Sequence, residues 1–281
     1  MNTVFFGLTG LGSAVLRGLL NCKDVIITSV YTKKYELPYP YYDEKQTGEI
    51  CAESGIKCFY DKEINSSEVK NKIMSESPDL IIVASFNRII SGEVLKIPKL
   101  GVINFHPSLL PAYKGPYPDQ AVLLNGEKET GVTVHYVTEK VDSGNIIFQR
   151  KILIDENDSY STLKKKIAEV SEQIVPEICS LFKDNNIPDG IPQDETKSSY
   201  FPKPKEKDCL INSETDIEKI INKVKAFNPF PGTYILINND RVYVSEYEIL
   251  SNNKTAKGIY DSENYTDIYF NSRGIRLFKK K

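Results

Sequence analysis

Continuous apolar runs alternate with helix-like segments over the first 106 residues, and this alternation limits the fold more than any other feature. The runs have the length of buried strands: "TVFFGL" (3–8), "DVIITSVY" (24–31), "IKCFY" (56–60), "DLIIVAS" (79–85) and "GVINFH" (101–106). Such strands, separated by helices, indicate a parallel sheet covered on both faces. We therefore predict an α/β, Rossmann-like domain with a mostly parallel sheet and helices on both faces. Ligands in these sheets bind at the carboxyl ends of the strands.

The pattern changes beyond residue 130. Two extended segments, joined near Glu139–Gly144, precede a long helix over about 159–183, in which Pro176 should cause a kink or a break. A stretch rich in proline and polar residues then indicates a linker, and short strands follow it. We predict a catalytic domain (1–187), a linker (188–208) and a small C-terminal, mostly β, OB-like domain (209–281).

Composition excludes several classes of protein. A formal net charge of −2 argues against a dedicated binder of nucleic acid or of a membrane surface. The five cysteines are widely spaced without a CxxC pair, which suits reduced thiols better than disulfides or zinc. The longest apolar runs are far short of the roughly 20 residues that a bilayer requires, and the first strand is not preceded by a basic leader. We expect a cytoplasmic protein with no membrane partner.

A glycine-rich turn follows the first strand. Gly7, Gly10 and Gly12 have the order GxxGxG instead of the dinucleotide-binding GxGxxG, and "SVYTKK" at the end of the second strand lacks an acidic residue for a ribose. We interpret the turn as close packing of strand against helix and expect no NAD. Two distant histidines and scattered cysteines likewise predict no metal site.

One of the two histidines stands at the end of the fifth apolar run. Because side chains alternate along a strand, Asn104 and His106 share a face and would both point into the ligand crevice. An amide can donate to a developing oxyanion, and an imidazole can exchange a proton near neutral pH. Asp142 is a candidate to orient that imidazole and to accept a proton from an attacking amine. A structural histidine and a turn aspartate remain the alternatives.

Several motifs in order resemble the formyltransferase family that uses 10-formyltetrahydrofolate. "NFHPSLLPAYKG", "ETGVTVHYV" and "VDSG" are similar to the Asn–x–His, Ser–Leu–Leu–Pro and Asp–x–Gly motifs shared by methionyl-tRNA formyltransferase and the amino-sugar N-formyltransferases. "FNRII" (86–90) and "FNPFPGTY" (227–234) extend the resemblance to most of the chain. The resemblance implies an N-formyltransferase with N10-formyltetrahydrofolate as cosubstrate.

The resemblance also implies roles for individual residues. Asn104, His106 and Asp142 match the catalytic trio. Lys114 stands where relatives often have arginine, which keeps the charge but loses a bidentate contact. The residues expected to bind the folate are Phe86, Arg88, Ile89, Ile90, Ser108, Leu109, Leu110, Pro111, Lys114, Thr138, Glu139, Lys140 and Val141. Tyr113 and Tyr117 are expected near the acceptor. His135, the second histidine, is interpreted as sheet packing.

The acceptor is predicted from weaker features. The stretch from Phe201 to Lys281 has 14 Lys and Arg against 11 Asp and Glu, a small surplus for an enzyme that binds tRNA phosphates. The loop 31–45 carries five tyrosines, which suit stacking on a base or a sugar. "KGPYPDQ" and "GVTVHYV" resemble the amino-sugar enzymes more, so we predict a nucleotide-linked 4-amino-4-deoxy sugar and a place in lipopolysaccharide biosynthesis.

Other functions remain open on the sequence. The first alternative is methionyl-tRNA formyltransferase, which formylates the amino group of initiator methionyl-tRNA. Others are a formyltetrahydrofolate hydrolase, in which water replaces the amine, and a non-catalytic folate or nucleotide binder, which would not need the trio. A homodimer is compatible with the sequence, which does not fix the oligomeric state.

Overall fold

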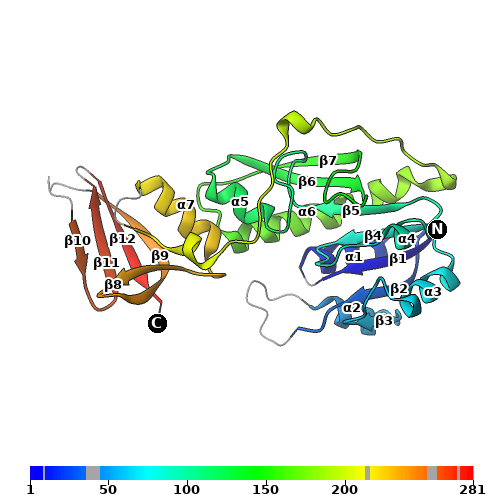
Figure 1. Cartoon of the computed structure of the whole chain (residues 1–281), viewed down its shortest axis with the longest axis horizontal. Helices are drawn as coiled ribbons and strands as arrows, with labels where there is room; N and C mark the ends of the chain where they lie inside the picture. The colour runs from blue at the N-terminus through cyan, green and yellow to red at the C-terminus, as the bar shows by residue number, and fades with distance from the viewer. Residues whose placement is uncertain (9, 36–44, 213–215, 252–257, 271–272, 281) are drawn as a thin grey trace. The chain divides into compact units, whose positions relative to one another are not determined.

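The computed structural model describes residues 1–8, 10–35, 45–212, 216–251, 258–270 and 273–280. The chain divides into two compact units (Figure 1). The first unit comprises residues 1–118, 129–153 and 164–201, and the second comprises residues 119–128, 154–163 and 202–281. Most of the tyrosine-rich loop 31–45 lies outside the described residues.

A seven-stranded sheet in the order β3-β2-β1-β4-β5-β6-β7 forms the first unit. The pairs among β1 to β5 are parallel, whereas β6 runs antiparallel to both β5 and β7. The prediction of a mostly parallel α/β sheet is confirmed. The strands are β1 (Asn2–Gly7), β2 (Ile26–Thr32), β3 (Cys58–Tyr60), β4 (Leu80–Ala84), β5 (Val102–His106), β6 (Glu129–Tyr136) and β7 (Ile146–Leu153).

Helices connect these strands, as the alternating pattern predicts. They are α1 (Leu11–Leu20), α2 (Thr47–Glu53), α3 (Ser67–Glu76), α4 (Gly92–Leu95), α5 (Pro118–Leu124) and α6 (Tyr160–Leu181), with short 3-10 turns at Lys183–Asn185, Glu195–Lys197 and Glu206–Cys209. The glycines of the first turn bring α1 close to the sheet. A Cβ on Gly12 would lie 2.9–3.1 Å from backbone atoms of Gly7 and Ala84, which agrees with the close-packing interpretation.

The long helix α6 runs unbroken through Pro176, so the predicted break does not occur. A proline lacks the N–H that would bond the carbonyl four residues earlier, here that of Glu172. This carbonyl lies against α1, where a Cβ on Gly18 would be 2.8 Å from the Glu172 oxygen. α6 therefore continues through Pro176, at a point where Gly18 allows α1 to pack closely against it.

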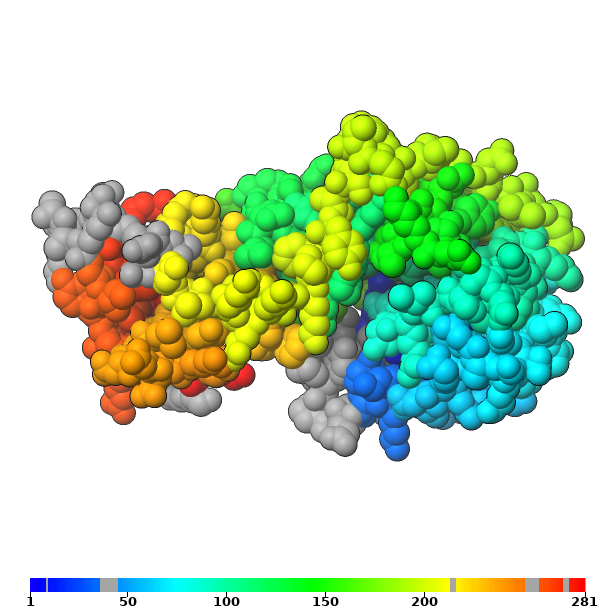
Figure 2. Space-filling view, in the orientation of Figure 1, coloured from blue at the N-terminus to red at the C-terminus, as the bar shows by residue number. Residues whose placement is uncertain are grey.

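Residues 188–201, predicted as part of a linker, pack along the first unit (Figure 2). Ile191 exchanges two backbone hydrogen bonds of 2.8 Å with Ile146 of β7. Farther along, the Lys114 N–H donates to the Ser199 carbonyl and the Phe201 N–H donates to the Lys114 carbonyl, each at 2.8 Å. We call residues 191–201 the strap, because they join β7 to the loop after β5.

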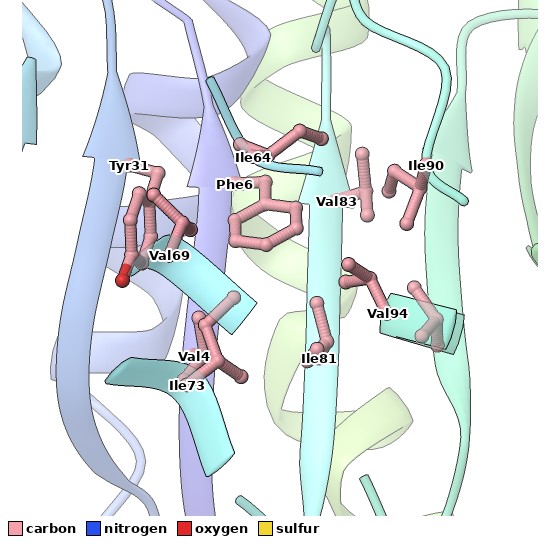
Figure 3. Close-up of a cluster of buried hydrophobic side chains, with 11 residues drawn as sticks. Val4, Phe6, Tyr31, Ile64, Val69, Ile73, Ile81, Val83, Ile90 and Val94 are labelled. Atoms are coloured by element: carbon pink, nitrogen blue, oxygen red, sulfur yellow. The ribbon is translucent and has the colours of Figure 1, made fainter. Parts of the chain in front are cut away.

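A cluster of buried side chains fills one face of the sheet (Figure 3). It joins β1, β2, β4 and β5 to α3 and α4, and includes Val4, Phe6, Tyr31, Ile64, Val69, Ile73, Ile81, Val83, Ile90, Val94 and Val102. Burying this many aliphatic and aromatic side chains contributes roughly 1.5–3 kcal/mol for each. This packing fixes the strand ends from which the polar residues project.

In the second unit, the described residues after 202 form a five-stranded antiparallel sheet in the order β10-β11-β12-β9-β8, together with the helix α7. Asp216 caps α7 by accepting from the Glu218 N–H, and the apolar face of the helix packs against the sheet. The elements are α7 (Ile217–Phe227), β8 (Thr233–Ile237), β9 (Asp240–Ser251), β10 (Gly258–Asp261), β11 (Tyr265–Phe270) and β12 (Arg273–Lys279). The prediction of a small, mostly β second domain is confirmed.

Candidate active site

The carboxyl end of β5 carries Asn104 and His106, as predicted. β5 pairs with β6 so that Asn104 lies opposite His135 and His106 lies opposite Thr133. Directly opposite residues of an antiparallel pair project from the same face of the sheet. The register therefore places both histidines of the chain and Asn104 together.

The His106 ring is buried and held by the loop that follows β5. Its Nε2 lies 2.9 Å from the Tyr113 carbonyl oxygen, which can only accept, so Nε2 carries a hydrogen. Nδ1 lies 3.7 Å from Oδ2 of Asp142, within the range of an ion pair when the ring is protonated. The imidazole thus has one nitrogen fixed by the backbone and the other facing a carboxylate.

Asp142 lies between the two imidazoles. Its Oδ2 accepts a 2.9 Å hydrogen bond from the Gly115 N–H, and its Oδ1 is 3.7 Å from Nε2 of His135. Asp142 has a φ of 48°, in the left-handed region that few residues other than glycine, asparagine and aspartate adopt. Two residues on, a Cβ on Gly144 would lie 1.9 Å from the Tyr136 carbonyl oxygen. The backbone of this loop therefore requires glycine at position 144, and it favours a small set of residues that includes aspartate at position 142.

His135 is part of this cluster, which the sheet-packing interpretation did not anticipate. Its Nδ1 donates to the Tyr136 carbonyl at 2.8 Å, so in the neutral ring Nε2 is the acceptor, 3.2 Å from Nδ2 of Asn104. Burial, and after it the charge of His106, lower the pKa of His135 to about 4, although the Asp142 carboxylate opposes the shift. His135 is thus a neutral acceptor that orients the Asn104 amide.

The two loops predicted to hold the pterin lie at this edge of the sheet. Ile89 is 74% exposed and Val141 is 49% exposed, so both present apolar surface to solvent. Ile90, by contrast, is buried in the core cluster. Phe86 stacks on Phe6 with ring centroids 5.3 Å apart.

Polar members of the same loops are exposed. Arg88 pairs with Glu63 at 2.6 Å. Thr138 donates through Oγ1 to the Lys140 carbonyl at 3.0 Å, and Glu139 is exposed. A cleft of about 240 Å³ opens beside Phe86 and Arg88 at the carboxyl ends of β1 and β2, lined also by Leu8, Tyr31, Thr32, Lys33, Asp61, Lys62 and Asn87.

The segment Ser108–Pro111 is held by contacts with its own loop and with β6. Ser108 donates to the Ala112 carbonyl at 2.9 Å, and the Leu110 N–H donates to Thr133 Oγ1 at 3.1 Å. Leu109 lies against Gly131, where a Cβ would be 2.5 Å from the leucine side chain. These residues hold the wall of the site in place, and Tyr113 and Tyr117 follow them, both half-buried.

Lys114 is buried next to the loop that carries Asp142, with 4% of its surface exposed. Its Nζ donates to Glu195 Oε1 at 3.0 Å and to Ser143 Oγ at 3.3 Å. Lys140 also approaches Glu195, at 3.6 Å. Lys114 thus connects Glu195 of the strap to Ser143, the residue that follows Asp142.

Two negative findings apply to the described parts of the chain. Within those parts no group of three or more His, Cys, Asp or Glu side chains could hold a metal ion. None of the described helices is both long enough and apolar enough to cross a bilayer.

Known families match most of the chain. Residues 14–179 match the Formyl transferase family, and residues 203–275 match the Formyl transferase C-terminal domain. The chain belongs to the formyl transferase family. Asn104, His106 and Asp142 of this N-formyltransferase all lie within residues 14–179, the matched segment.

The formyltransferase is similar in sequence to methionyl-tRNA formyltransferases. It is 32% identical to that of Thermotoga neapolitana over 250 residues, which cover 86% of this chain and 77% of the relative. It is 28% identical to that of Staphylococcus aureus over 258 residues, which cover 89% of this chain and 80% of the relative.

Solved structures of sugar enzymes share its fold over the whole length. An N-formyltransferase from Helicobacter canadensis, in complex with folinic acid and dTDP-3-aminofucose, has a TM-score of 0.73 and 22% identity, with 99% of each chain covered. WlaRD, a sugar 3N-formyl transferase with dTDP and 5-N-formyl-THF present, has a TM-score of 0.69 and 24% identity, with 99% and 97% covered.

Proposed function

We propose that this formyltransferase transfers a formyl group from N10-formyltetrahydrofolate to the primary amine of a nucleotide-linked amino sugar. The observation that carries the chemistry is the cluster of Asn104, His106 and Asp142 at the carboxyl edge of the sheet. Within it Asp142 lies 3.7 Å from both imidazoles, and the Asn104 amide is oriented by a neutral histidine. Each group has a role in acyl transfer to an amine.

Asn104 is the donor for the oxyanion that forms when an amine attacks the formyl carbon. One hydrogen on its Nδ2 is directed at Nε2 of His135, which leaves the second hydrogen for the oxyanion. An amide fixed in this way needs no reorganisation as charge develops, which is the basis of oxyanion stabilisation. A protonated Nδ1 of His106 would be the second donor, because Nε2 is already bonded to Tyr113.

Asp142 is the acceptor for the proton that the attacking amine loses. Its carboxylate uses one site on Oδ2 for the Gly115 N–H and keeps further lone pairs, since a carboxylate can accept about four hydrogen bonds. A general base of this kind must be within hydrogen-bond reach of the amine, directly or through one water. The burial of the site limits the number of competing waters.

The formyl donor fits the loops beside this cluster. The exposed apolar side chains of Ile89 and Val141 suit the faces of a pterin ring, and the backbone of Thr138–Val141 offers polar groups for its edge. The folate supplies the formyl carbon, and tetrahydrofolate leaves as the C–N10 bond breaks and N10 takes up the proton that the amine gave to Asp142. Lys114 and the segment Ser108–Pro111, both held from within, would support that side of the site.

The arginines of the second unit favour a sugar acceptor over tRNA. Phosphate contacts from Lys and Arg supply most of the affinity for nucleic acid. The three arginines between residues 202 and 281 already face carboxylates: Arg241 pairs with Glu206, Arg273 with Glu218 and Arg276 with Asp267. The similar fold of enzymes whose ligands are dTDP and dTDP-3-aminofucose supports the same choice.

The proposal also specifies which carbon of the sugar carries the amino group. The motifs "KGPYPDQ" and "GVTVHYV" favour a 4-amino-4-deoxy sugar, whereas the two sugar enzymes above are described with a 3-amino sugar and as a 3N-formyl transferase. We retain the 4-amino sugar and include both classes in the test. The role in lipopolysaccharide biosynthesis, the cytoplasmic location and a homodimer stay predictions.

Methionyl-tRNA is the second candidate acceptor. Identity of 32% to the Thermotoga neapolitana enzyme over 86% of this chain favours it. Hydrolysis of the formyl donor by water and simple folate binding without turnover are the further alternatives, and the assay described next tests them too.

The deciding experiment measures tetrahydrofolate release from 10-formyltetrahydrofolate in parallel reactions. The acceptors are dTDP- and UDP-linked 4-amino sugars, their 3-amino counterparts, charged initiator methionyl-tRNA, and water alone. Asn104→Ala serves as the chemically impaired control. We expect release with a nucleotide-linked amino sugar. Release with tRNA alone would transfer the assignment to the second candidate, and release in water alone would make the chain a hydrolase.

A further inference from the structure

The strap contacts both halves of the active site. Gln193 donates from Nε2 to the Asp142 carbonyl at 2.9 Å and to the Gly144 carbonyl at 2.8 Å. These two bonds bracket the turn that presents the Asp142 carboxylate. Two residues earlier, the backbone pair between Ile191 and Ile146 fixes the strap on β7.

Both the side chain and the main chain of Asp142 are therefore held by hydrogen bonds. The Gly115 N–H bonds its carboxylate, and Gln193 bonds its main-chain carbonyl. A residue with a φ of 48° persists only when its surroundings determine that conformation. The amide of Gln193 is the side chain that supplies this constraint from outside the loop.

The strap also reaches His106 through one intervening residue. The Tyr113 N–H donates to Ser199 Oγ at 2.8 Å, and the Tyr113 carbonyl accepts from Nε2 of His106 at 2.9 Å. The next residue, Lys114, exchanges backbone bonds with Ser199 and Phe201 and an ion pair with Glu195. The strap also packs on Gly115, where a Cβ would lie 2.6 Å from the Phe201 carbonyl oxygen.

We propose that Gln193, assisted by Ser199, is a positioning residue that sets the geometry between Asp142 and His106. Gln193 orients the aspartate through the carbonyls of its turn, and Ser199 orients the histidine through the backbone of Tyr113, whose N–H bonds Ser199 and whose carbonyl bonds His106. Neither side chain bonds the reacting groups directly. Because the kinetic test assays formyl transfer, that part rests on the proposed function.

The first experiment compares Gln193→Leu with wild type and with Gln193→Glu. Leucine keeps the bulk but removes both donors, so kcat falls roughly 10- to 100-fold as the aspartate loses its alignment. KM for the folate changes less than about threefold, because Gln193 bonds the carbonyls of Asp142 and Gly144 and not those of residues 138–141, which face the pterin. Gln173→Leu, at an exposed position on α6, is the matched control and keeps wild-type kcat.

Gln193→Glu gives a pH signature that a general loss of stability would not. A protonated glutamic acid can still donate one hydrogen bond to a carbonyl, whereas an ionised carboxylate facing two carbonyl oxygens can donate none. The ratio of mutant to wild-type kcat therefore falls as the pH rises through the titration of the introduced carboxyl group. The same ratio for Gln193→Leu stays flat with pH.

The second experiment needs no acceptor, so it remains decisive if the proposed acceptor is wrong. Only two histidines are present, so ¹⁵N NMR resolves the imidazole signals of His106 and His135. In Gln193→Leu and in the milder Ser199→Ala, the His106 ring signals shift, while 5-formyltetrahydrofolate still binds with unchanged affinity. Imidazole signals identical to wild type in both variants would overturn the proposal. Loss of folate binding in parallel with kcat would also overturn it.

Discussion

The Asn104 side chain donates a 3.2 Å hydrogen bond to His135, a histidine that is almost completely buried on the neighbouring antiparallel strand. The Tyr136 carbonyl fixes the hydrogen on the other ring nitrogen, so Nε2 can only accept. His135 therefore decides which way the Asn104 amide faces. An asparagine without this partner could rotate and offer its carbonyl to the oxyanion, which would destabilise the transition state.

Replacing His135 should reduce kcat mainly through Asn104, which bonds His135 at 3.2 Å, whereas Asp142 is 3.7 Å away. In His135→Phe the amide loses its acceptor, and we expect kcat to fall roughly fivefold, as for loss of a hydrogen bond worth on the order of 1 kcal/mol. His135→Gln can keep an acceptor near the position of Nε2 and should recover most of the activity. Steady-state kinetics with saturating folate measures both. Equal losses in the two variants would show that the amide orientation is not what His135 provides.

The low pKa of His135 makes the stability of the first unit depend on pH. Burial and the charge of His106 lower this pKa from 6.5 to about 4, so the unfolded chain binds the proton more readily. The free energy of unfolding is therefore highest above pH 6.5 and decreases as the pH falls from 6.5 toward 4. The decrease from this residue is roughly 3 kcal/mol.

Urea denaturation at pH 7.5 and 4.5 tests this dependence. Carboxylates also titrate in this range, so the comparison is made with His135→Gln, which has no proton to bind at this position. We expect wild type to lose more stability than the variant between the two pH values. The same loss in both proteins would contradict the assigned neutral state.

His106 and Asp142 should each be required for chemistry but not for folate binding. His106→Ala removes a donor to the oxyanion, and Asp142→Asn removes the acceptor for the amine proton, so each should reduce kcat by roughly 10²–10⁴-fold. Affinity for 5-formyltetrahydrofolate, measured by calorimetry, should stay close to that of wild type. Near-normal rates in either variant would remove that residue from the mechanism.

The strands and the shared face of Asn104 and His106 could be predicted because their signals are local, whereas Asp142 was added through the resemblance of "VDSG" to a family motif. Continuous apolar runs identify buried parallel strands, and the two-residue spacing of Asn104 and His106 places them on one face. The position of His135 could not be predicted this way, because it depends on the antiparallel register that puts it opposite Asn104. Nothing in "GVTVHYV" sets that register. The alternation with Val132 and Val134 indicates only a strand.

The strap was missed for a related reason. Its composition is that of a linker, but its role depends on long-range bonds, such as those from Gln193 to the turn 51 residues earlier. Local composition carries no information about such partners.

Pro176 is a similar case, because whether a proline breaks a helix depends on what packs against the carbonyl it leaves without a partner.

Gly144→Ala should separate the geometry of the catalytic turn from the stability of the fold. An alanine Cβ would lie 1.9 Å from the Tyr136 carbonyl oxygen, so the backbone must move. This shift would displace the Asp142 carboxylate from both imidazoles, and a misplacement of about 1 Å can reduce kcat by roughly 100-fold. We expect such a loss in kcat together with a lower melting temperature.

Gly55→Ala is the matched control for that variant. Gly55 has a φ of 67° with no atom within 4 Å of the added Cβ, so alanine there strains the backbone without a clash. It lies in the turn between α2 and β3, outside the catalytic cluster. This variant should lower the melting temperature while kcat stays at the wild-type value. If Gly144→Ala lost no more activity than Gly55→Ala, the turn would not be what aligns Asp142.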